Sequence, residues 1–347
     1  MSDVVRPVLA LDLGGTQVRT AIVLANGRRL VHQASATPIQ LGPRAIVQAC
    51  VDLLAATLDQ APGDVRAALS GIGISAPGPV NPWTGVIVSP PNLGPAFRDV
   101  PIAAQLEAAL GLPAYLDRDT NVAALGEQTF GAARGIDDFL YLTVSTGVGG
   151  AIVSAGHLVH GPDGMAGELG HVSIELDGPV CGCGGSGHLE AIASGVALAR
   201  DARLAVARGT SPFLAARIAR EAGAPGQAGS GLEARDVAEG EEAGDPTCQA
   251  LMGHARRAFA MACAGFVNTF NPDLLVVGGS IAQHQGERLL GPARDEIRRG
   301  SFPVPAARVR VVAAELGPDV SLAGAQPLVE GRRDDDRWRA GRARIEG

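Results

Sequence analysis

Short apolar runs separated by glycine turns open the chain. Residues 8–13 (VLALDL) and 18–24 (VRTAIVL) are runs typical of buried strands, and a Gly-Gly-Thr turn lies between them. Asn26-Gly27 predicts a type I′ hairpin turn that leads into a strand over residues 29–33. A glycine turn that joins two strands differs from the strand–turn–helix unit of a Rossmann or P-loop site, so neither of these sites is expected here.

The same order of strand, glycine turn, strand and tight turn returns about 130 residues later. Its strands are predicted at residues 139–144 and 151–153, with the glycine turn at 145–150. The repeat suggests an internal duplication, whose two halves face each other across a cleft and each offer one glycine turn to a ligand. Two unrelated hairpins in a large α/β protein are the alternative.

Helical spacing of apolar residues dominates the rest of the chain. Helices are predicted over residues 45–58, 189–207, 211–221, 247–270 and 286–299, and strands over 113–117, 274–277 and 308–313. Residues 331–347 mix both charges with few apolar side chains, so we expect a frayed tail in which Trp338 is exposed.

Composition narrows the class of protein. A length of 347 residues suits about two domains, and 46% hydrophobic with 19% charged residues indicates a globular chain. The net charge of −7 disfavours nucleic acid and anionic membranes as partners, and no apolar run reaches the roughly 18 residues of a spanning helix. Five cysteines are too few for a disulfide framework, and no basic and apolar leader precedes the first strand, so we expect a cytoplasmic protein.

All 29 basic residues are arginines, and the absence of lysine excludes a P-loop lysine, a Schiff base or a lysyl general base. Any phosphate must therefore be held by backbone N–H groups, arginine or a metal ion. Asp12 ends the first predicted strand beside a glycine turn, which favours a carboxylate that serves the Mg²⁺ of a nucleotide. A simple turn cap is the other interpretation. Three glycine turns at strand ends (14–15, 147–150 and 278–279) favour the nucleotide.

Asp119 is the strongest candidate for a catalytic group. It lies between the strand at 113–117 and a helix that begins near Asn121. The positive end of the helix dipole stabilises a carboxylate at this elbow, as a general base for a substrate hydroxyl requires. An ordinary helix cap would occupy the same position, and position alone does not separate the two.

Residues 167–190 carry the densest chemical signal. His171, Cys181, Cys183 and His188 supply four nitrogen and sulfur ligands within 18 residues, a set typical of structural Zn²⁺. Buried cysteines with unrelated histidines are the alternative. Glu168 and Glu190 bracket this cluster and suit hydrogen bonds to the hydroxyls of a sugar, although each could also be a solvated surface charge.

Four motifs together resemble the ROK family of sugar kinases and sugar-responsive repressors. They are DLGGT at residues 12–16, RDTNVAALGE at 118–127, STGVGG at 145–150 and the cysteine-rich segment 167–190. The resemblance runs from about Val8 to Ala325 and includes Asn271-Pro272-Asp273. It implies an α/β fold of the duplicated ribonuclease-H-like type shared by actin and hexokinases, with two domains that flank a cleft.

The resemblance also implies domains, a partner chain and site residues. A small N-terminal domain over residues 1–117, completed by about 308–330, would precede a large domain over 118–307 and the tail at 331–347. A homodimer is expected. Asp119 would be the catalytic base, and the sugar would be bound by Gly78, Arg118, Asp119, Glu168, His171 and Glu190. ATP and its Mg²⁺ would be bound by Asp12, Gly14, Gly15, Thr16, Thr146, Gly147, Gly149, Gly278 and Gly279. Structural Zn²⁺ would be bound by His171, Cys181, Cys183 and His188.

Three residues depart from the family pattern. Gln17 replaces a lysine, His188 replaces a third zinc-ligating cysteine, and Arg118 replaces an asparagine that hydrogen-bonds the sugar. The second change keeps a ligand set competent for zinc. The third bears on substrate identity, because arginine only donates hydrogen bonds whereas asparagine donates and accepts them. Arg118 is expected to face the sugar, and the alternative is that its guanidinium turns away to pair with Asp117 or with the phosphates of ATP, in place of an absent lysine.

The expected function is ATP- and Mg²⁺-dependent phosphorylation of the primary hydroxyl of a hexose, with glucose as the expected substrate. A kinase for fructose, mannose or an N-acylated hexosamine is an alternative. A sugar-sensing regulator would carry a further helix-turn-helix domain, for which no room is expected before Val8, and it would not need Asp119. A noncatalytic actin-like protein would not need the zinc cluster or the two glutamates.

Overall fold

The computed structural model describes residues 6–222 and 231–346, and the chain divides into two compact units. The first comprises residues 1–137, 151–167 and 314–347, and the second comprises residues 138–150 and 168–313. The helix that starts at Asp119 thus lies in the first unit, whereas the sequence interpretation places residues 118–307 in the second domain. Among the described helices, none combines the length and the apolar character needed to span a membrane.

The first unit is built on a five-stranded sheet of order β3-β2-β1-β4-β7. Its strands are β1 Val8–Leu13, β2 Gln17–Val23, β3 Arg29–Ala36, β4 Ile72–Ala76 and β7 Ala114–Arg118. β1 and β2 form an antiparallel hairpin, whereas β4 runs parallel to β1 and β7 runs parallel to β4. The carboxyl ends of β1, β4 and β7 therefore meet at one edge of the sheet.

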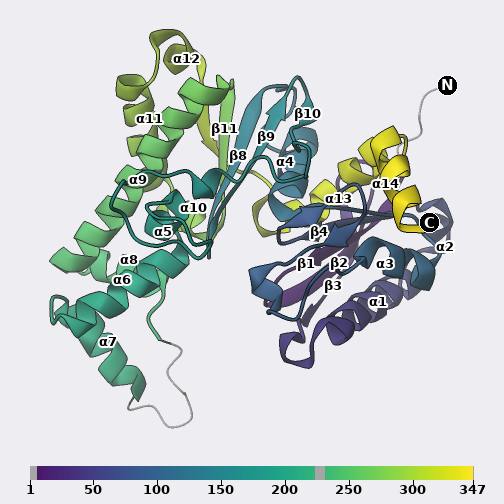
Figure 1. Ribbon diagram of the computed structural model, residues 1–347, viewed down its shortest axis with the longest axis horizontal. Coiled ribbons are helices and arrows are strands. Elements are labelled where there is room, and N and C mark those ends of the chain that lie inside the picture. The colour runs from purple at the N-terminus through teal and green to yellow at the C-terminus, as the bar shows by residue number, and fades with distance from the viewer. Residues whose placement is uncertain (1–5, 223–230, 347) are drawn as a thin grey trace. The chain divides into compact units, whose positions relative to one another are not determined.

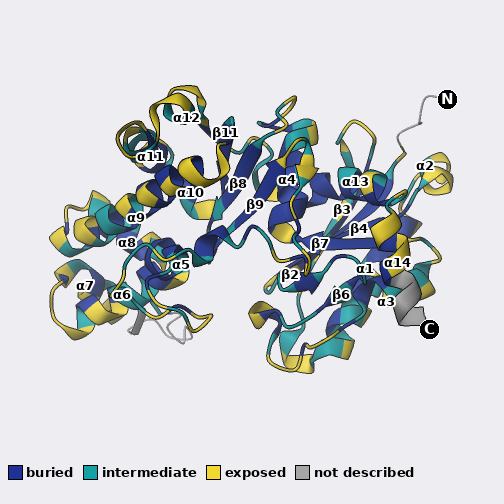
Figure 2. Cartoon of the chain, turned by 45° about the horizontal axis from the view of Figure 1, so that its top comes forward, coloured by how far each residue is buried: buried dark blue, intermediate teal, exposed yellow. Residues whose placement is uncertain are grey.

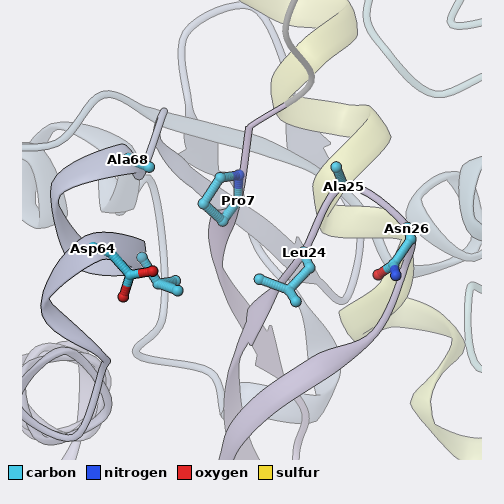
Figure 3. Close-up of a pocket in the computed structure, with 7 residues that line it drawn as sticks. Pro7, Leu24, Ala25, Asn26, Asp64 and Ala68 are labelled. Atoms are coloured by element: carbon cyan, nitrogen blue, oxygen red, sulfur yellow. The ribbon is translucent and has the colours of Figure 1, made fainter.

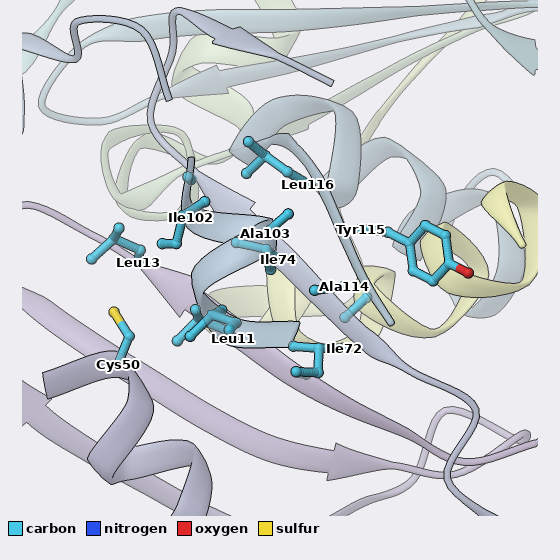
Figure 4. Close-up of a cluster of buried hydrophobic side chains, with 14 of the residues drawn as sticks. Leu11, Leu13, Cys50, Ile72, Ile74, Ile102, Ala103, Ala114, Tyr115 and Leu116 are labelled. Atoms are coloured by element: carbon cyan, nitrogen blue, oxygen red, sulfur yellow. The ribbon is translucent and has the colours of Figure 1, made fainter. Parts of the chain in front are cut away.

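Helices pack on this sheet and close its core. The helices of this unit are α1 Pro43–Asp59, α2 Gly63–Ala68, α3 Ile102–Leu110, α4 Asp119–Phe130, α13 Val320–Arg332 and α14 Asp336–Glu346. The unit also contains a two-stranded ribbon of β5 Val80–Asn81 and β6 Val86–Ile87. Its 3₁₀ turns are η1 Ile39–Leu41, η2 Pro91–Leu93 and η4 Gly317–Asp319. α1 packs on β1 to β3, and α13 packs on β1, β4 and α4 (Figure 1). Figure 4 shows Leu11 and Ile74 of the sheet with Cys50 of α1 and Ile102 of α3, all fully buried.

A second five-stranded sheet has the order β10-β9-β8-β11-β12. Its strands are β8 Phe139–Val144, β9 Val148–Ser154, β10 His157–Leu158, β11 Leu274–Gly278 and β12 Arg310–Ala313. The second unit adds the helices α5 Leu189–Ala193, α6 Gly195–Ala207, α7 Pro212–Ala222, α8 Ala234–Glu242, α9 Pro246–Phe270, α10 Ser280–Gln285, α11 Glu287–Gly300 and α12 Pro303–Arg308, and the 3₁₀ turn η3 Leu169–His171. Strands β8 and β11 are almost entirely buried, whereas the long helices also expose residues (Figure 2). In both sheets a hairpin precedes two parallel strands in the spatial order, as the duplicated ribonuclease-H-like fold requires.

The turn between β2 and β3 differs from the predicted type I′ turn. Leu24 and Arg28 pair around a three-residue loop, and Gly27 has a φ of +78° whereas Asn26 is not in the left-handed region. A type I′ turn needs positive φ at both central residues, so the observed turn is the three-residue kind that ends on a left-handed glycine.

The predicted frayed tail is also wrong, because residues 336–346 form helix α14. Trp338 is only 6% exposed, and its ring lies 5.0 Å from that of Tyr115 in β7. The aromatic ring supplies the apolar contact that the charged sequence around it does not suggest.

Candidate functional site

The elbow between β7 and α4 presents the predicted catalytic base. β7 ends at Arg118, and α4 begins at the next residue, Asp119. The Asp119 side chain is exposed. Its Oδ1 accepts a hydrogen bond from the backbone N–H of Thr120 at 2.7 Å. The carboxylate therefore lies at the positive end of the helix dipole, which stabilises its charge.

The strand registers place the predicted Mg²⁺ carboxylate at the same edge of this sheet. Asp12 of β1 is level with Ser75 of β4, and Ser75 is level with Asp117 of β7. Adjacent strands lie about 4.8 Å apart, so Asp12 and the elbow are separated by only two strand spacings. Gly78 follows β4 at this edge and forms a cis peptide with Pro79.

Asp12 has a partner that the sequence interpretation missed. Arg19 donates to Oδ2 of Asp12 from Nη2 at 2.6 Å and from Nε at 3.1 Å, and Ser75 donates to Oδ1 at 2.9 Å. The sequence contained a signal for this ion pair, because the predicted hairpin places Arg19 directly opposite Asp12. A carboxylate accepts at about four lone-pair positions, so these residues still fit hydrated Mg²⁺.

Arg118 is buried and hydrogen-bonded to the protein itself. Its side chain is 3% exposed, and its guanidinium donates to the carbonyl oxygen of Ala166 and, at 3.4 Å, to Oδ1 of Asn121. The sequence interpretation assigned Arg118 to the substrate, but the contacts seen here are with the protein itself.

A buried polar network lies directly behind the elbow. Oδ2 of Asp117 lies 2.7 Å from Nε2 of His160 and 2.8 Å from Nη2 of Arg332, and Oδ1 accepts from Nδ2 of Asn121 at 2.7 Å. Burial alone would raise the pKa of Asp117, but the hydrogen bond and charge of His160, the charge of Arg332 and the Asn121 amide hold this pKa well below its usual range. Asp117 is fully buried, and the sequence interpretation named it only as an alternative partner of Arg118, since nothing local distinguishes it from a surface carboxylate.

In the second unit, two of the predicted glycine turns come together. The turn after β8 is closed by a hydrogen bond from Ser145 N–H to the Gly147 carbonyl at 2.9 Å. Oγ of Ser145 lies 2.9 Å from Oγ of Ser280, which directly follows Gly278 and Gly279. The turn at residues 145–147 and the turn at Gly279 are thus linked through the two hydroxyls, whereas residues 148–150 of the predicted turn already belong to β9.

The four predicted zinc ligands also come together. One ligand atom from each of His171, Cys181, Cys183 and His188 lies within 4.8 Å of all the others. Sγ of Cys181 is 3.6 Å from Nδ1 of His171, and Sγ of Cys183 is 3.2 Å from Nδ1 of His188. Ligand atoms of a tetrahedral zinc site lie about 3.3–3.8 Å apart, so the residues fit the ion. Burial raises the pKa of the Cys181 thiol, and a bound cation would favour the thiolate instead.

The two glutamates that bracket the zinc ligands have different surroundings. Oε2 of Glu190 accepts from the Val148 N–H at 3.0 Å, and Oε1 lies 3.8 Å from Sγ of Cys181. Glu190 therefore joins the zinc ligands to the glycine turn after β8. Oε2 of Glu168 lies 3.9 Å from Nε2 of His171, the ring nitrogen that the zinc ligands leave free.

A hollow of about 410 Å³ elsewhere in the first unit is separate from these residues (Figure 3). It is lined by Pro7, Leu24, Ala25, Asn26, Asp64, Val65 and Ala68. Pro7 precedes β1, so this hollow lies at the opposite end of that strand from Asp12. Its mainly apolar lining, with a single carboxylate, does not suit a nucleotide.

Known proteins resemble this chain over nearly its whole length. The model of the ROK family matches residues 8–332. A glucokinase of Thermotoga maritima is 32% identical over 94% of this chain and 98% of its own length. An N-acetylmannosamine kinase of Shigella flexneri is also 32% identical, over 94% of this chain and 99% of its own. The crystal structure of a ROK family glucokinase from Streptomyces griseus, in complex with glucose and AMPPNP, is 31% identical with a TM-score of 0.76 and covers 94% of this chain and 99% of its own.

Proposed function

Because the chain belongs to the ROK family of sugar kinases, we propose that it transfers the γ-phosphoryl group of ATP to the primary hydroxyl of a hexose, with glucose as its main substrate. The observation that carries the proposal is the elbow: an exposed carboxylate at a helix N-terminus, on the same sheet edge as a second carboxylate beside a glycine turn. Phosphoryl transfer to a hydroxyl needs a base at one position and charge stabilisation at another.

Asp119 is proposed as the general base. Its carboxylate takes the proton of the primary hydroxyl while that oxygen forms a bond to the γ-phosphorus. The bond from this phosphorus to the bridging oxygen of ADP breaks in line, so hexose phosphate and ADP are the products.

Backbone N–H groups are proposed to hold the phosphates, since the chain has no lysine to do so. The turn residues proposed for ATP are Gly14, Gly15, Thr16, Thr146, Gly147 and Gly149 for the phosphates, and Gly278 and Gly279 for the adenosine side. Asp12 would hold the hydrated Mg²⁺ that accompanies ATP, and this ion would neutralise charge on the transferred group. Arg19 keeps the Asp12 carboxylate in one orientation.

Gly78, Glu168, His171 and Glu190 are proposed to bind the sugar hydroxyls. The zinc ligands His171, Cys181, Cys183 and His188 would fix the segment that carries the two glutamates. His171 serves both purposes, because one ring nitrogen faces the thiols and the other faces Glu168.

An N-acylated hexosamine is the second candidate substrate, because N-acetylmannosamine kinases match this chain with the same identity as glucokinases. A panel of glucose, mannose, fructose and N-acetylmannosamine in an assay that couples ADP release to a visible signal separates the two. We expect the highest kcat/KM with glucose. Higher kcat/KM with the N-acylated sugar would make the second candidate correct.

The same assay tests the base. Asp119→Asn keeps the shape of the side chain and removes the proton acceptor, so we expect kcat to fall by at least about 10²-fold while sugar binding changes far less. Asp52→Asn, an exposed carboxylate of α1 away from the proposed site, is the matched control. Near-normal turnover of the Asp119 variant would show that this residue only supports the helix.

A further inference from the structure

The segment from His160 to Ala166 forms a loop that is attached to the elbow at both ends. The Ala166 N–H donates to the His160 carbonyl at 3.0 Å, which closes the loop. At one end, Nε2 of His160 lies 2.7 Å from Oδ2 of Asp117. At the other end, the guanidinium of Arg118 donates to the Ala166 carbonyl. Two consecutive residues of β7 thus hold the two ends of one loop, and all of these contacts lie within the first unit.

Burial makes these attachments strong. Asp117 is 0% exposed, Arg118 3% and His160 9%, so water competes little for their hydrogen bonds. The other oxygen positions of Asp117 are occupied by Nη2 of Arg332, Nδ2 of Asn121 and the Arg118 N–H. His160 cannot swing away easily, since its ring also packs edge-on against Trp83 at 5.1 Å.

We infer that Arg118 and His160 are positioning residues that fix loop 160–166, and through it the start of the segment that carries Glu168. Glu168 lies two residues beyond Ala166 in the sequence. The inference rests on the proposed function, in which Glu168 binds the sugar. The Arg118 guanidinium donates to the Ala166 carbonyl, so in this arrangement the residue acts on the sugar through the loop rather than by touching a hydroxyl.

Four variants and one control separate these roles. Arg118→Met keeps the apolar stem and removes the donors, and His160→Ala removes the other attachment. His160→Gln retains an N–H donor near the position of Nε2, and the fourth variant combines Arg118→Met with His160→Ala. Arg298→Met, on the exposed surface of α11, is the matched control for loss of an arginine.

The first measurement is hydrogen exchange of the Ala166 amide, which does not depend on activity. We expect exchange to be at least about tenfold faster in Arg118→Met and in His160→Ala, as loss of one shielded hydrogen bond predicts. His160→Gln and Arg298→Met should keep the protection of the unaltered protein. Unchanged exchange in both single variants would overturn the inference.

The second measurement is steady-state kinetics with the sugar panel. Each single variant should raise the sugar KM by about tenfold, in equal proportion for every accepted hexose, with the KM for ATP within about twofold. Because one loop is held at both ends, the double variant should show less than the product of the two single effects. His160→Gln should restore most of the lost sugar affinity.

Direct contact of Arg118 with the sugar would give another result. The ranking of hexoses would then change in Arg118→Met alone, and the two single effects would multiply in the double variant, which would overturn the inference. If the unaltered protein phosphorylated no hexose, the proposed function would fail, while the exchange measurement would still decide the role of the loop attachments. If Arg118→Met failed to fold, the comparison of His160→Ala with His160→Gln would decide it.

Discussion

At the scale of single residues, the elbow depends on the buried charged side chains behind it as well as on the exposed carboxylate of Asp119. Asp117 is surrounded by His160, Arg332 and Asn121, and each of these comes from a different segment of the chain. A buried charge of this kind is stable only while its partners remain, since removal of one leaves the other without compensation. Asp117 therefore couples the stability of the first unit to the position of the elbow that carries the proposed base.

This coupling predicts a pH-dependent difference in stability. Asp117→Asn removes the carboxylate 2.8 Å from buried Arg332 and leaves Asp335, at 3.8 Å, as its remaining counter-charge, so the free energy of unfolding at pH 7 should fall by up to about 3–5 kcal/mol. The lowered pKa of Asp117 means that its contribution is complete above the ordinary carboxyl pKa and is lost as the pH falls below it. The difference between the two proteins should thus be constant from pH 7 to about pH 5 and shrink below about pH 4.

Urea denaturation at several pH values measures this difference. Asp52→Asn on the exposed face of α1 is the control, and it should change the unfolding free energy little at any pH. A difference for Asp117→Asn that grew on acidification would contradict the assignment of a lowered pKa.

At the scale of elements, the crossing of α4 with α13 holds the elbow helix in place. A Cβ atom on Gly324 of α13 would lie 1.8 Å from the carbonyl oxygen of Val122 in α4, and one on Gly126 of α4 would lie 2.8 Å from the carbonyl oxygen of Val320. The two backbones therefore approach more closely than any side chain would allow. This contact begins three residues after Asp119, so it bears directly on the position of the proposed base.

We expect Gly324→Ala to push these helices apart and to lower stability by about 1–3 kcal/mol or more, the range found for overpacked interiors. Gly331→Ala, near the end of the same helix, is the matched control, because its Cβ would meet open space and alanine favours the helix by up to about 1 kcal/mol. Thermal melting of both variants tests the crossing. If Gly324→Ala melted at the same temperature as the unaltered protein, the two helices would be able to move apart and accommodate the added methyl group.

The four proposed zinc ligands are also tested at the scale of elements, because they would hold one segment of the chain together. We expect the purified protein to contain about one equivalent of zinc, and His188→Ala to lose most of it, because a site with three protein ligands is no longer closed. His157→Ala, at an exposed histidine in β10, should keep the metal. Elemental analysis of the three proteins provides the measurement, and an unaltered protein free of zinc but fully active would exclude a structural role for the ion.

At the scale of the whole molecule, the carboxyl end of the chain completes the core that its amino end begins. Trp338 of α14 packs on Tyr115 of β7, and Arg332 and Arg337 lie over the ring of Trp83 at 4.2 and 3.9 Å. Residues separated by more than 200 positions in the sequence thus stabilise the strand that ends at the elbow. The final helix is part of the first unit and not an appendage to it.

Trp338→Ala should accordingly lower the free energy of unfolding by about 3–5 kcal/mol, as for other buried large aromatic residues. Phe302→Ala is the control, since this phenylalanine is 71% exposed and should contribute little. Chemical denaturation provides the comparison. A small effect at Trp338 would show that α14 does not pack stably on β7.

The sequence by itself determined the local features of this protein. The alternation of apolar runs and glycine turns predicted β1, β2, β8 and β11, and the spacing of His171, Cys181, Cys183 and His188 predicted the ligand cluster, because these patterns depend on neighbours within about 20 residues. The motifs at residues 12–16 and 118–127 predicted the ROK family, which the comparisons confirm.

Only the tertiary structure decided which partners the charged residues take. Arg118 was expected to face a sugar, yet it reaches a carbonyl 48 residues away, and Asp117 finds Arg332 across 215 residues. The charged tail forms a helix whose one tryptophan, Trp338, is buried against Tyr115 of β7. Such contacts depend on which segments folding brings together, and long-range proximity leaves no periodic trace in a single sequence.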